Sequence, residues 1–420
     1  MSSIYYTSLT GMLAASYGLQ NTANNVANMQ SPGFKRSEVS YSSLGHGNGQ
    51  DSLGQGVTIG GQTTNFTQGN YTETANPSDL AIVGQGFFIV KLQHGEFRYT
   101  RDGEFGFNQD GILIDKHSGG TVQGYDKKGS LVPISQFGPT TNAGKPTHFV
   151  NLKGEWIIVE LEKDPNTPES PDPFKSKFEP IQFNVTNIFD TEGKAHTIRL
   201  EFESPGTPGK GKNPFENLKW NLKSATCDDA TLTFDPQSIE YDSDNNGVAK
   251  KEDNTLQFIL NGNQRVTLNL SNNLSDQDSS VRLYKKDAAH NNTKIEAQIN
   301  DGYSVGKQIG FSFDENGQIT YHYDNAQKED GTHVALALFD DLEHSLIQGE
   351  NNLFRAKRAD GITIGRPNQH SFGAIKAKQL EASNVDSTME FSNIVVLQRM
   401  FQACSQIMDI DKQLLEELEK

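Results

Sequence analysis

The chain has 420 residues, of which 34% are hydrophobic, and carries a formal net charge of −16. This length exceeds a single core and predicts about two to four domains. The negative charge argues against nucleic acid and anionic membrane surfaces as partners, because phosphate binding depends on clustered Lys and Arg. The adjacent pair Lys35 and Arg36 is interpreted as surface charge.

Cysteine usage and hydropathy exclude further classes. The only two cysteines, Cys227 and Cys404, lie in segments of different character, which argues against a disulfide framework and against a cysteine-rich metal site. No apolar run approaches the roughly 20 residues that span a bilayer. The N-terminal residues also lack the pattern of a conventional secretion signal.

Residues 3–26 carry the heptad pattern of a packing helix. Steps of four and three residues alternate without a break through Tyr5, Leu9, Met12, Ser16, Leu19, Ala23 and Val26. Residues 2–34 contain no Asp, Glu, Lys or Arg, although a solvated helix normally carries charge on its outer face. Two interpretations follow: contact with other subunits on most sides, or a terminal helix that lies on its own domain.

The helical pattern ends at Ser31-Pro32-Gly33, because Pro breaks a helix and Gly accepts a positive φ. Residues 34–70 are polar and rich in glycine, and a stiff two-stranded arm and a flexible linker both fit them. From residue 71 onward, strand-like runs at 80–83, 87–90, 97–100 and 112–114 are separated by glycine turns. We expect a compact β domain here.

Residues 144–300 differ in composition from the preceding stretch. Proline and charge clusters alternate there with strand-like runs such as 157–161, 183–188 and 198–202. We interpret this stretch as an inserted, solvent-facing β domain. Strands resume at 309–313, 319–323 and 334–339 and are expected to complete the sheet begun near residue 71. The predicted fold is therefore α+β and mostly β, with paired terminal helices and two nested β-rich domains, the outer one an insertion.

The C-terminal residues 394–418 repeat the heptad pattern of the first helix, so we expect the two chain ends to pair. The predicted domains are then a helical coiled-coil core at 1–30 and 380–420, a glycine-rich connecting arm at 31–70 and 360–379, an inner β domain at 71–145 and 301–359, and an outer β domain at 146–300. The predicted interface residues are Tyr5, Leu9, Met12, Leu19, Ala23, Val26, Ile394, Leu397, Phe401, Cys404, Met408, Leu415 and Leu418.

Residues 302–306 match the G-x-S-x-G pattern of serine hydrolases, with Ser304 as the central residue. That chemistry needs the Ser on a sharp turn from a strand into a helix, whereas a strand pattern follows here. The histidines show no zinc-binding spacing either. We therefore predict no enzymatic activity and no cofactor.

Residues 242–253 have the spacing of an oxygen-rich calcium loop, with Asp242, Asp244, Asn246 and Asp253 as the candidate ligands. The twelfth residue is Asp where Glu is usual, and two lysines place positive charge in the loop. A polar hairpin turn is the preferred interpretation, and a calcium site is the alternative.

Several segments together resemble one family. Residues 9–12 (Leu-Thr-Gly-Met), 21–28 (Asn-Thr-Ala-Asn-Asn-Val-Ala-Asn) and 31–36 (Ser-Pro-Gly-Phe-Lys-Arg) resemble the N-terminal signature of bacterial flagellar rod and hook proteins. Residues 380–386, together with Gln398, Arg399 and Gln402, resemble the C-terminal signature. Residues 84–88 and 99–103 resemble the shared β domain of that family, and residues 311–317 and 349–353 resemble its returning half. The long insert favours a hook subunit over a rod subunit.

The resemblance implies a structural polymer subunit whose terminal helices form an antiparallel coil lining a hollow, flexible tube, which carries torque from rod to filament in motility. Neighbouring copies would bury the apolar positions given above. The implied partners are copies of the chain itself, the flagellar rod, hook cap and hook–filament junction proteins, and the flagellar export apparatus, with no nucleic acid and no membrane insertion. The implied location is the flagellar hook or basal body, reached by type III export without a cleaved signal peptide. A distal rod subunit is the alternative, and a secreted β-rich hydrolase or calcium-binding adhesin is the alternative from another class.

Overall fold

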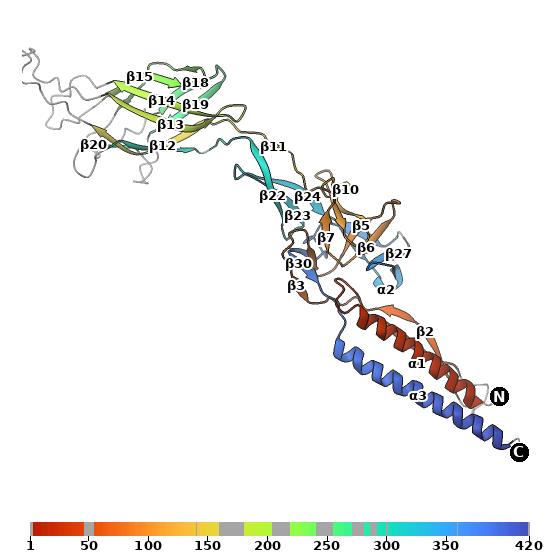
Figure 1. The fold of residues 1–420 in the computed structure, drawn as a ribbon. Coiled ribbons are helices and arrows are strands. Elements are labelled where there is room, and N and C mark those ends of the chain that lie inside the picture. Colours follow the sequence, from red (N-terminus) through yellow and green to blue (C-terminus); the bar gives the residue numbers. More distant parts are fainter. Residues whose placement is uncertain are drawn as a thin grey trace, which may run out of the picture. The chain divides into compact units, whose positions relative to one another are not determined.

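The computed structural model describes residues 3–45, 54–139, 141–158, 180–203, 219–240, 255–270, 281–285, 292–299, 301–358 and 360–418. The chain divides into two compact units (Figure 1). Unit 1 comprises Met1–Gly138, Ile309–His322 and Lys328–Lys420, and unit 2 comprises Pro139–Gln308 and Tyr323–Gln327. Unit 1 therefore contains both ends of the chain, and unit 2 is inserted into its sequence.

The two terminal helices are α1 (Ser3–Ala27) and α3 (Ser387–Leu418), which lie side by side in unit 1 (Figure 1). Helix α3 begins before the predicted residue 394. The reason is a local cap, because Asp386 Oδ1 accepts the backbone N–H of Thr388 at 2.8 Å. The apolar pattern predicts the start of the helix at the first heptad residue, whereas the helix begins at the cap.

A two-stranded hairpin arm packs along α1. It consists of β1 (Ser37–Ser43) and β2 (Val57–Thr64), which pair antiparallel with a bulge after Ser40. Tyr41 Oη donates to Ala14 O, and the Val57 N–H donates to Thr10 Oγ1 at 3.2 Å. Of the two possibilities left open for this glycine-rich stretch, the described residues form the two-stranded arm.

The β domain of unit 1 contains the short helix α2 (Leu342–Ser345) and the strands β5 (Phe87–Lys91), β6 (Phe97–Thr100), β7 (Phe105–Phe107), β8 (Leu113–Asp115), β9 (Thr121–Tyr125), β10 (Leu131–Pro133), β24 (Lys328–Val334), β25 (Leu336–Phe339), β26 (Leu346–Gln348), β27 (Leu353–Ala356) and β28 (Ile362–Gly365). The sheet runs in the order β24–β9–β5–β6–β27–β26. The predicted strand 334–339 is divided between β24 and β25, since the chain passes there from pairing with β9 to pairing with β5.

Aromatic side chains fill the core of this β domain. Phe87, Tyr99, Phe339 and Phe354 are buried and meet mostly edge to face, the preferred arrangement of aromatic rings. Two short ladders bring the returning chain back to the start of the domain: β3 (Tyr71–Glu73) pairs with β30 (Gln379–Glu381), and β4 (Leu80–Val83) pairs with β29 (Ala374–Ala377). These two ladders join residues that lie roughly 300 positions apart in the sequence.

Unit 2 is all β in its described parts. Its strands are β11 (Thr141–Asn142), β12 (Phe149–Ile158), β13 (Ile181–Phe189), β14 (Ala195–Glu203), β15 (Lys219–Cys227), β16 (Leu232–Thr233), β17 (Ser238–Glu240), β18 (Thr255–Leu260), β19 (Gln264–Asn269), β20 (Val281–Lys285) and β21 (Lys294–Ile299). Strands β22 (Gly306–Phe313) and β23 (Gln318–Tyr323) contribute residues to both units. Of the predicted strand 157–161, residues 159–161 lie outside the described residues.

The core of unit 2 follows from simple alternation. Side chains along the first half of β13 are alternately buried and exposed, which is the period of two expected for a strand with one face in a core. Trp156 and Trp220 are both fully buried in this core, with ring centroids 5.6 Å apart. These are the only two tryptophans in the sequence, and both lie in unit 2.

Candidate assembly interface

The side of α1 that faces α3 is formed by small residues. Ser8, Ala15, Thr22 and Asn25 are almost completely buried, and Gly11 and Gly18 continue the same steps of four and three. A Cβ atom at Gly11 would lie 2.8 Å from Cys404 Sγ, and one at Gly18 would lie 3.0 Å from a Leu397 methyl carbon. The two helices are therefore antiparallel and closely packed, and only small side chains fit along this contact line.

The contact line on α1 runs one residue before the heptad predicted from the larger apolar residues. Leu9, Met12, Leu19 and Val26 each follow a contact-line residue and are half-buried, whereas Ser16 and Ala23 are exposed. Large residues cannot occupy the centre of the contact because the helix backbones approach too closely there. The larger apolar residues therefore flank the intramolecular contact.

The predicted interface residues of α3 lie nearer to the contact between the two helices than those of α1 do. Ile394, Leu397, Cys404 and Met408 are half-buried, and Tyr5 of α1 is also half-buried. Phe401 and Leu415 keep 38% and 43% of their surface exposed, and Leu418 is the last residue of the helix.

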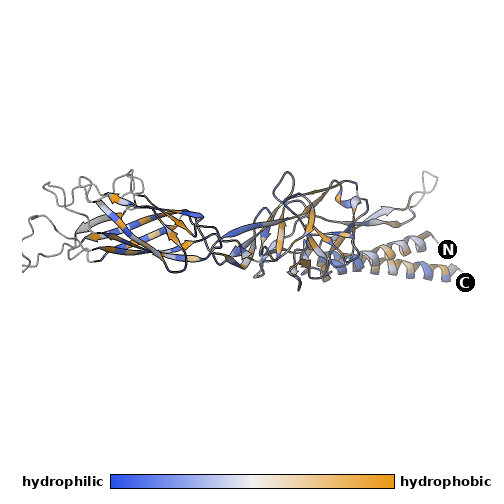
Figure 2. Cartoon of the chain, turned by 90° about the horizontal axis from the view of Figure 1, so that it is seen from above, coloured by the Kyte–Doolittle hydropathy of each residue, from blue (hydrophilic) through white to orange (hydrophobic). Residues whose placement is uncertain are grey.

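A second apolar line on α3 is largely exposed in the described part of unit 1. Its residues follow the heptad spacing, and each comes one position before a residue on the side of α3 that faces α1. They are Met389, Val396, Met400, Ala403, Ile407, Ile410 and Leu414. Val396 is 61% exposed and Ile410 is 55% exposed. Figure 2 shows the apolar colour distributed along both helices. A single step along a helix turns it by about 100°, so this line, here called the outer stripe, lies on a different side from the contact with α1.

Amide side chains explain why α1 is polar without being charged. Asn25 is buried and pairs with the backbone of Ser37 in both directions: its Nδ2 donates to Ser37 O and its Oδ1 accepts the Ser37 N–H. Asn21 Nδ2 donates to the same carbonyl oxygen at 2.8 Å. A carboxylate cannot donate and an ammonium cannot accept, so neither kind of charged side chain satisfies both partners, whereas an amide does. These contacts fix the start of the hairpin arm against the helix.

The junction between the helices and the β domain contains a buried group of three charges. Lys35 Nζ donates to Glu381 Oε1 and to Thr67 O, and Arg101 contacts Glu381 Oε2 at 3.3 Å. Lys35 and Glu381 are fully buried. Burial lowers the pKa of Lys35 below its usual value, although the Glu381 carboxylate opposes this shift. The three residues come from the N-terminal segment, the C-terminal segment and the β domain, and so connect all three.

The interpretation of Lys35 and Arg36 as surface charge is wrong. Lys35 is buried, and Arg36 forms ion pairs with Glu38 and Glu390 at 3.0 Å while only 16% of its side chain is exposed. The sequence offered one indication that these two charges are unusual: they are the first charged side chains after more than thirty uncharged residues. Glu381 and Glu390 lie about 350 residues away, and no local pattern indicates them.

A buried carboxyl group lies beside this junction. Asp102 is 1% exposed, and its Oδ1 accepts the Glu104 N–H at 3.0 Å. Its Oδ2 lies 3.5 Å from His117 Nδ1. Burial raises the pKa of Asp102 to about 6, and the nearby Asp115 carboxylate adds to the rise, whereas the hydrogen bond from Glu104 and the His117 charge oppose it.

The residues singled out for chemistry do not assemble into a reaction centre in the described parts. Ser304 lies two residues before β22, so a strand follows it as predicted, and its carbonyl oxygen accepts from Asn325 Nδ2. The candidate calcium ligands at 242–253 lie outside the described residues. Within the described residues, no group of three or more His, Cys, Asp or Glu side chains is placed to hold a metal ion. No helix in these residues is long and apolar enough to cross a membrane.

Two family profiles match segments of unit 1 and the boundary of unit 2. Residues 81–144 match "Flagellar hook protein FlgE/F/G D1 domain", and residues 376–420 match "Flagellar basal body rod FlgEFG protein C-terminal". The flagellar hook protein FlgE of Escherichia coli is 26% identical over 419 residues, and the match covers 98% of each chain. Two segments of the chain thus match the flagellar hook and rod protein family, and the similarity to hook proteins extends over nearly the whole chain.

Other members of the hook family match over similar lengths. The flagellar hook protein FlgE of Borreliella burgdorferi is 25% identical, with 98% of each chain covered. The crystal structure of the Helicobacter pylori flagellar hook protein FlgE2 matches with 14% identity and a TM-score of 0.42, covering 74% of this chain and 100% of that one. The family is a structural one. The fold agrees with the predicted class, since terminal helices are combined with a mostly β remainder.

Proposed function

We propose that this structural subunit of the flagellar hook polymerises through its terminal helices into a hollow tube. The observation that carries the proposal is the outer stripe of α3. Apolar side chains at heptad spacing indicate a helix packed on two sides, yet most of the outer stripe is exposed in the described part of unit 1. Copies of the same chain supply the missing partner in a homopolymer.

Helix α1 fits the same arrangement. It has no acidic residue in its first turn and no basic residue in its last turn, and Ile4, Tyr6 and Leu13 are about half exposed. Packing uncharged helices against each other avoids the desolvation of charged groups. The predicted interface residues Leu9, Met12, Leu19 and Val26 flank the contact with α3 and are therefore available to a neighbouring helix.

The remaining parts of the proposal concern mechanics and partners. The tube acts as a bendable joint that passes torque from the rod to the filament during motility. Its ends contact the rod, the hook cap and the hook–filament junction proteins, and subunits reach the growing tip through the flagellar export apparatus without a cleaved signal. The full-length matches to hook proteins support this assignment over a distal rod subunit, because the family profiles themselves are shared by hook and rod.

The first experiment is electron microscopy of the purified chain under polymerising conditions. We expect curved hollow tubes from the native chain, and no tubes from a version that lacks residues 2–26 and 394–420. Straight tubes would favour the distal rod. Tubes formed by the trimmed version would contradict an assembly based on the terminal helices.

A sharper version changes the outer stripe alone. Val396→Lys combined with Ile410→Lys places two charges on the stripe, and we expect tube formation to be lost while the helical circular dichroism signal is kept. The matched control is Gln398→Lys combined with Gln402→Lys, which adds the same charge to exposed positions on the other side of α3. Equal assembly of the two variants would show that the stripe is not an interface.

A further inference from the structure

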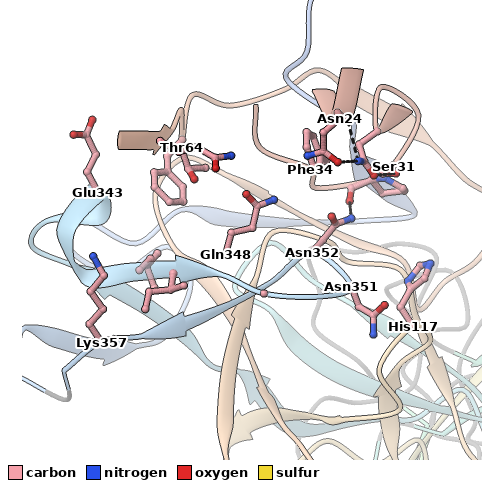
Figure 3. A pocket seen from close by; sticks show the side chains of 17 residues that line it. Asn24, Ser31, Phe34, Thr64, His117, Glu343, Gln348, Asn351, Asn352 and Lys357 are labelled. Atoms are coloured by element: carbon pink, nitrogen blue, oxygen red, sulfur yellow. Dashed lines mark hydrogen bonds between the residues drawn. The ribbon is translucent and has the colours of Figure 1, made fainter. Parts of the chain in front are cut away.

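A cleft of about 730 Å³ lies within unit 1, beside the last turn of α1 (Figure 3). One wall is formed by the hairpin of β26 and β27, and the other by Gln62 and Thr64 near the end of β2. The hairpin turn holds its shape through two consecutive asparagines with positive φ, Asn351 and Asn352. Asn352 Nδ2 donates to Pro32 O at 3.0 Å and so fixes the turn to the segment after α1.

Among the described residues, strand β26 is the terminal strand of its sheet, and its outer edge borders this cleft. It pairs on one side with β27, with Gln348 opposite Phe354. The flanking hydrogen bonds join Lys357 N–H to Ser345 O and Gly349 N–H to Leu353 O, both at 2.8 Å. Because antiparallel strands alternate between bonded and non-bonded pairs, the backbone N–H and C=O of Gln348 point away from β27.

Strand β2 on the opposite wall also pairs on one side only, with β1. The cleft therefore lies between two strands that each have a partner on one side. Six of its seventeen lining residues are Asn or Gln, among them Asn24, Asn28, Gln348 and Asn352. The charged or titratable residues of the lining are Glu343, Lys357 and His117.

This chemistry suits an extended peptide. Free strand edges bind peptide main chain by continuing the ladder, and side-chain amides both donate to and accept from peptide groups. A highly charged ligand such as a polyphosphate would need several cations, whereas Lys357 is the only lysine or arginine in the lining. The volume lies in the range of ordinary ligand sites.

We propose that an extended segment of a second copy of this chain occupies the cleft and pairs with the β26 edge. The inference rests on the proposed polymerisation. The cleft begins at Asn24 and Asn28, on the same helix pair through which copies associate, so a neighbour packed along the helices reaches it. The strands of the hairpin arm supply a matching chemistry, because β1 and β2 together carry a single charged residue, Glu38.

The first test removes one backbone donor. Gln348→Pro deletes the outward N–H without removing a hydrogen bond to β27, which edge strands tolerate. Gln348→Ala is the matched control, since it removes the side chain but keeps the donor. We expect the critical concentration for tube formation to rise about tenfold for Gln348→Pro, the equivalent of one lost hydrogen bond, and to change little for Gln348→Ala.

The second test does not depend on a perturbed strand. A benzophenone photo-cross-linker placed at the exposed Ile347 should join two copies in assembled tubes and should give no such product in the monomer. Peptide mapping then identifies the segment of the second copy. An unchanged critical concentration for Gln348→Pro, or tubes without inter-chain cross-links, would overturn the cleft proposal while leaving polymerisation intact. Failure of the native chain to form tubes would instead count against the proposed function.

Discussion

A buried ionisable group can make the stability of unit 1 depend on pH, and Asp102 is such a group. Its carboxyl group is buried near Asp115, and its pKa is raised from an ordinary 3.8 to about 6. An acid whose folded-state pKa is raised binds its proton more tightly in the folded state. It therefore favours folding at low pH and opposes folding once it ionises, so its unfavourable effect grows as the pH rises from about 4 to about 6.

Replacing Asp102 with Asn should remove this penalty. The amide keeps the oxygen that accepts the Glu104 N–H but cannot ionise. We expect Asp102→Asn to stabilise unit 1 at neutral pH by up to about 3 kcal/mol, the equivalent of the pKa rise, and to lose the advantage near pH 4. Thermal unfolding followed by the helical circular dichroism signal measures this, because the helices among the described residues lie in unit 1.

The control for this experiment is Asp110→Asn, a change of the same kind at an exposed position. It should leave the pH dependence of unfolding unchanged. A stabilisation by Asp102→Asn that is equal at pH 4 and pH 7 would show that ionisation of this carboxyl group is not the cause.

At the scale of elements, the close approach of α1 and α3 depends on glycine at the contact line. A Cβ atom at Gly18 would lie 2.4 Å from Tyr41 Oη as well as 3.0 Å from Leu397. Both neighbours belong to other elements, the hairpin arm and α3. The glycine therefore sets the distance of α1 from two partners at once.

We expect Gly18→Val to destabilise unit 1 by about 1–3 kcal/mol, the usual effect of forcing extra atoms into a filled contact. Ser16→Val is the control, because it introduces the same β-branched side chain at an exposed position of the same helix. The measurement is the midpoint of helical unfolding. A Gly18→Val midpoint equal to that of Ser16→Val would show that the helices can separate without loss.

At the scale of the whole molecule, the two units have separate cores and separate optical probes. Trp156 and Trp220 report on unit 2, and the helices of the described residues report on unit 1. The Lys35–Glu381–Arg101 group lies entirely in unit 1, where it joins the two chain ends to the β domain. Its disruption should therefore appear in one signal and not in the other.

We expect Glu381→Gln to destabilise unit 1 by about 3–5 kcal/mol, since it leaves two buried cations without their shared anion. Lys35→Met should have a smaller effect, because the pair of Arg101 and Glu381 remains. Urea unfolding followed by circular dichroism should shift for Glu381→Gln, while the tryptophan fluorescence transition should not. A matching shift in tryptophan fluorescence would contradict the independence of the two units.

The sequence by itself determined the features that depend on neighbouring residues. The heptad spacing of residues 3–26 indicated α1, the Asp and Gly turns marked the strands of the β domain, and the matching signatures at both ends indicated the family. These signals are local, since backbone preferences and side-chain periodicity act over a few residues. The pairing of the two ends also followed, because both carry an apolar pattern that needs a partner.

Only the tertiary structure decided which side of each helix meets the other, how Lys35 is buried, and where β26 presents an open edge. Gly11 and Gly18 lie on the contact line in place of the larger Met12 and Leu19, because the close approach of the two backbones admits only small residues. Lys35 is buried because Glu381 compensates its charge from the far end of the sequence. Such contacts join residues hundreds of positions apart, so no pattern within either segment encodes them.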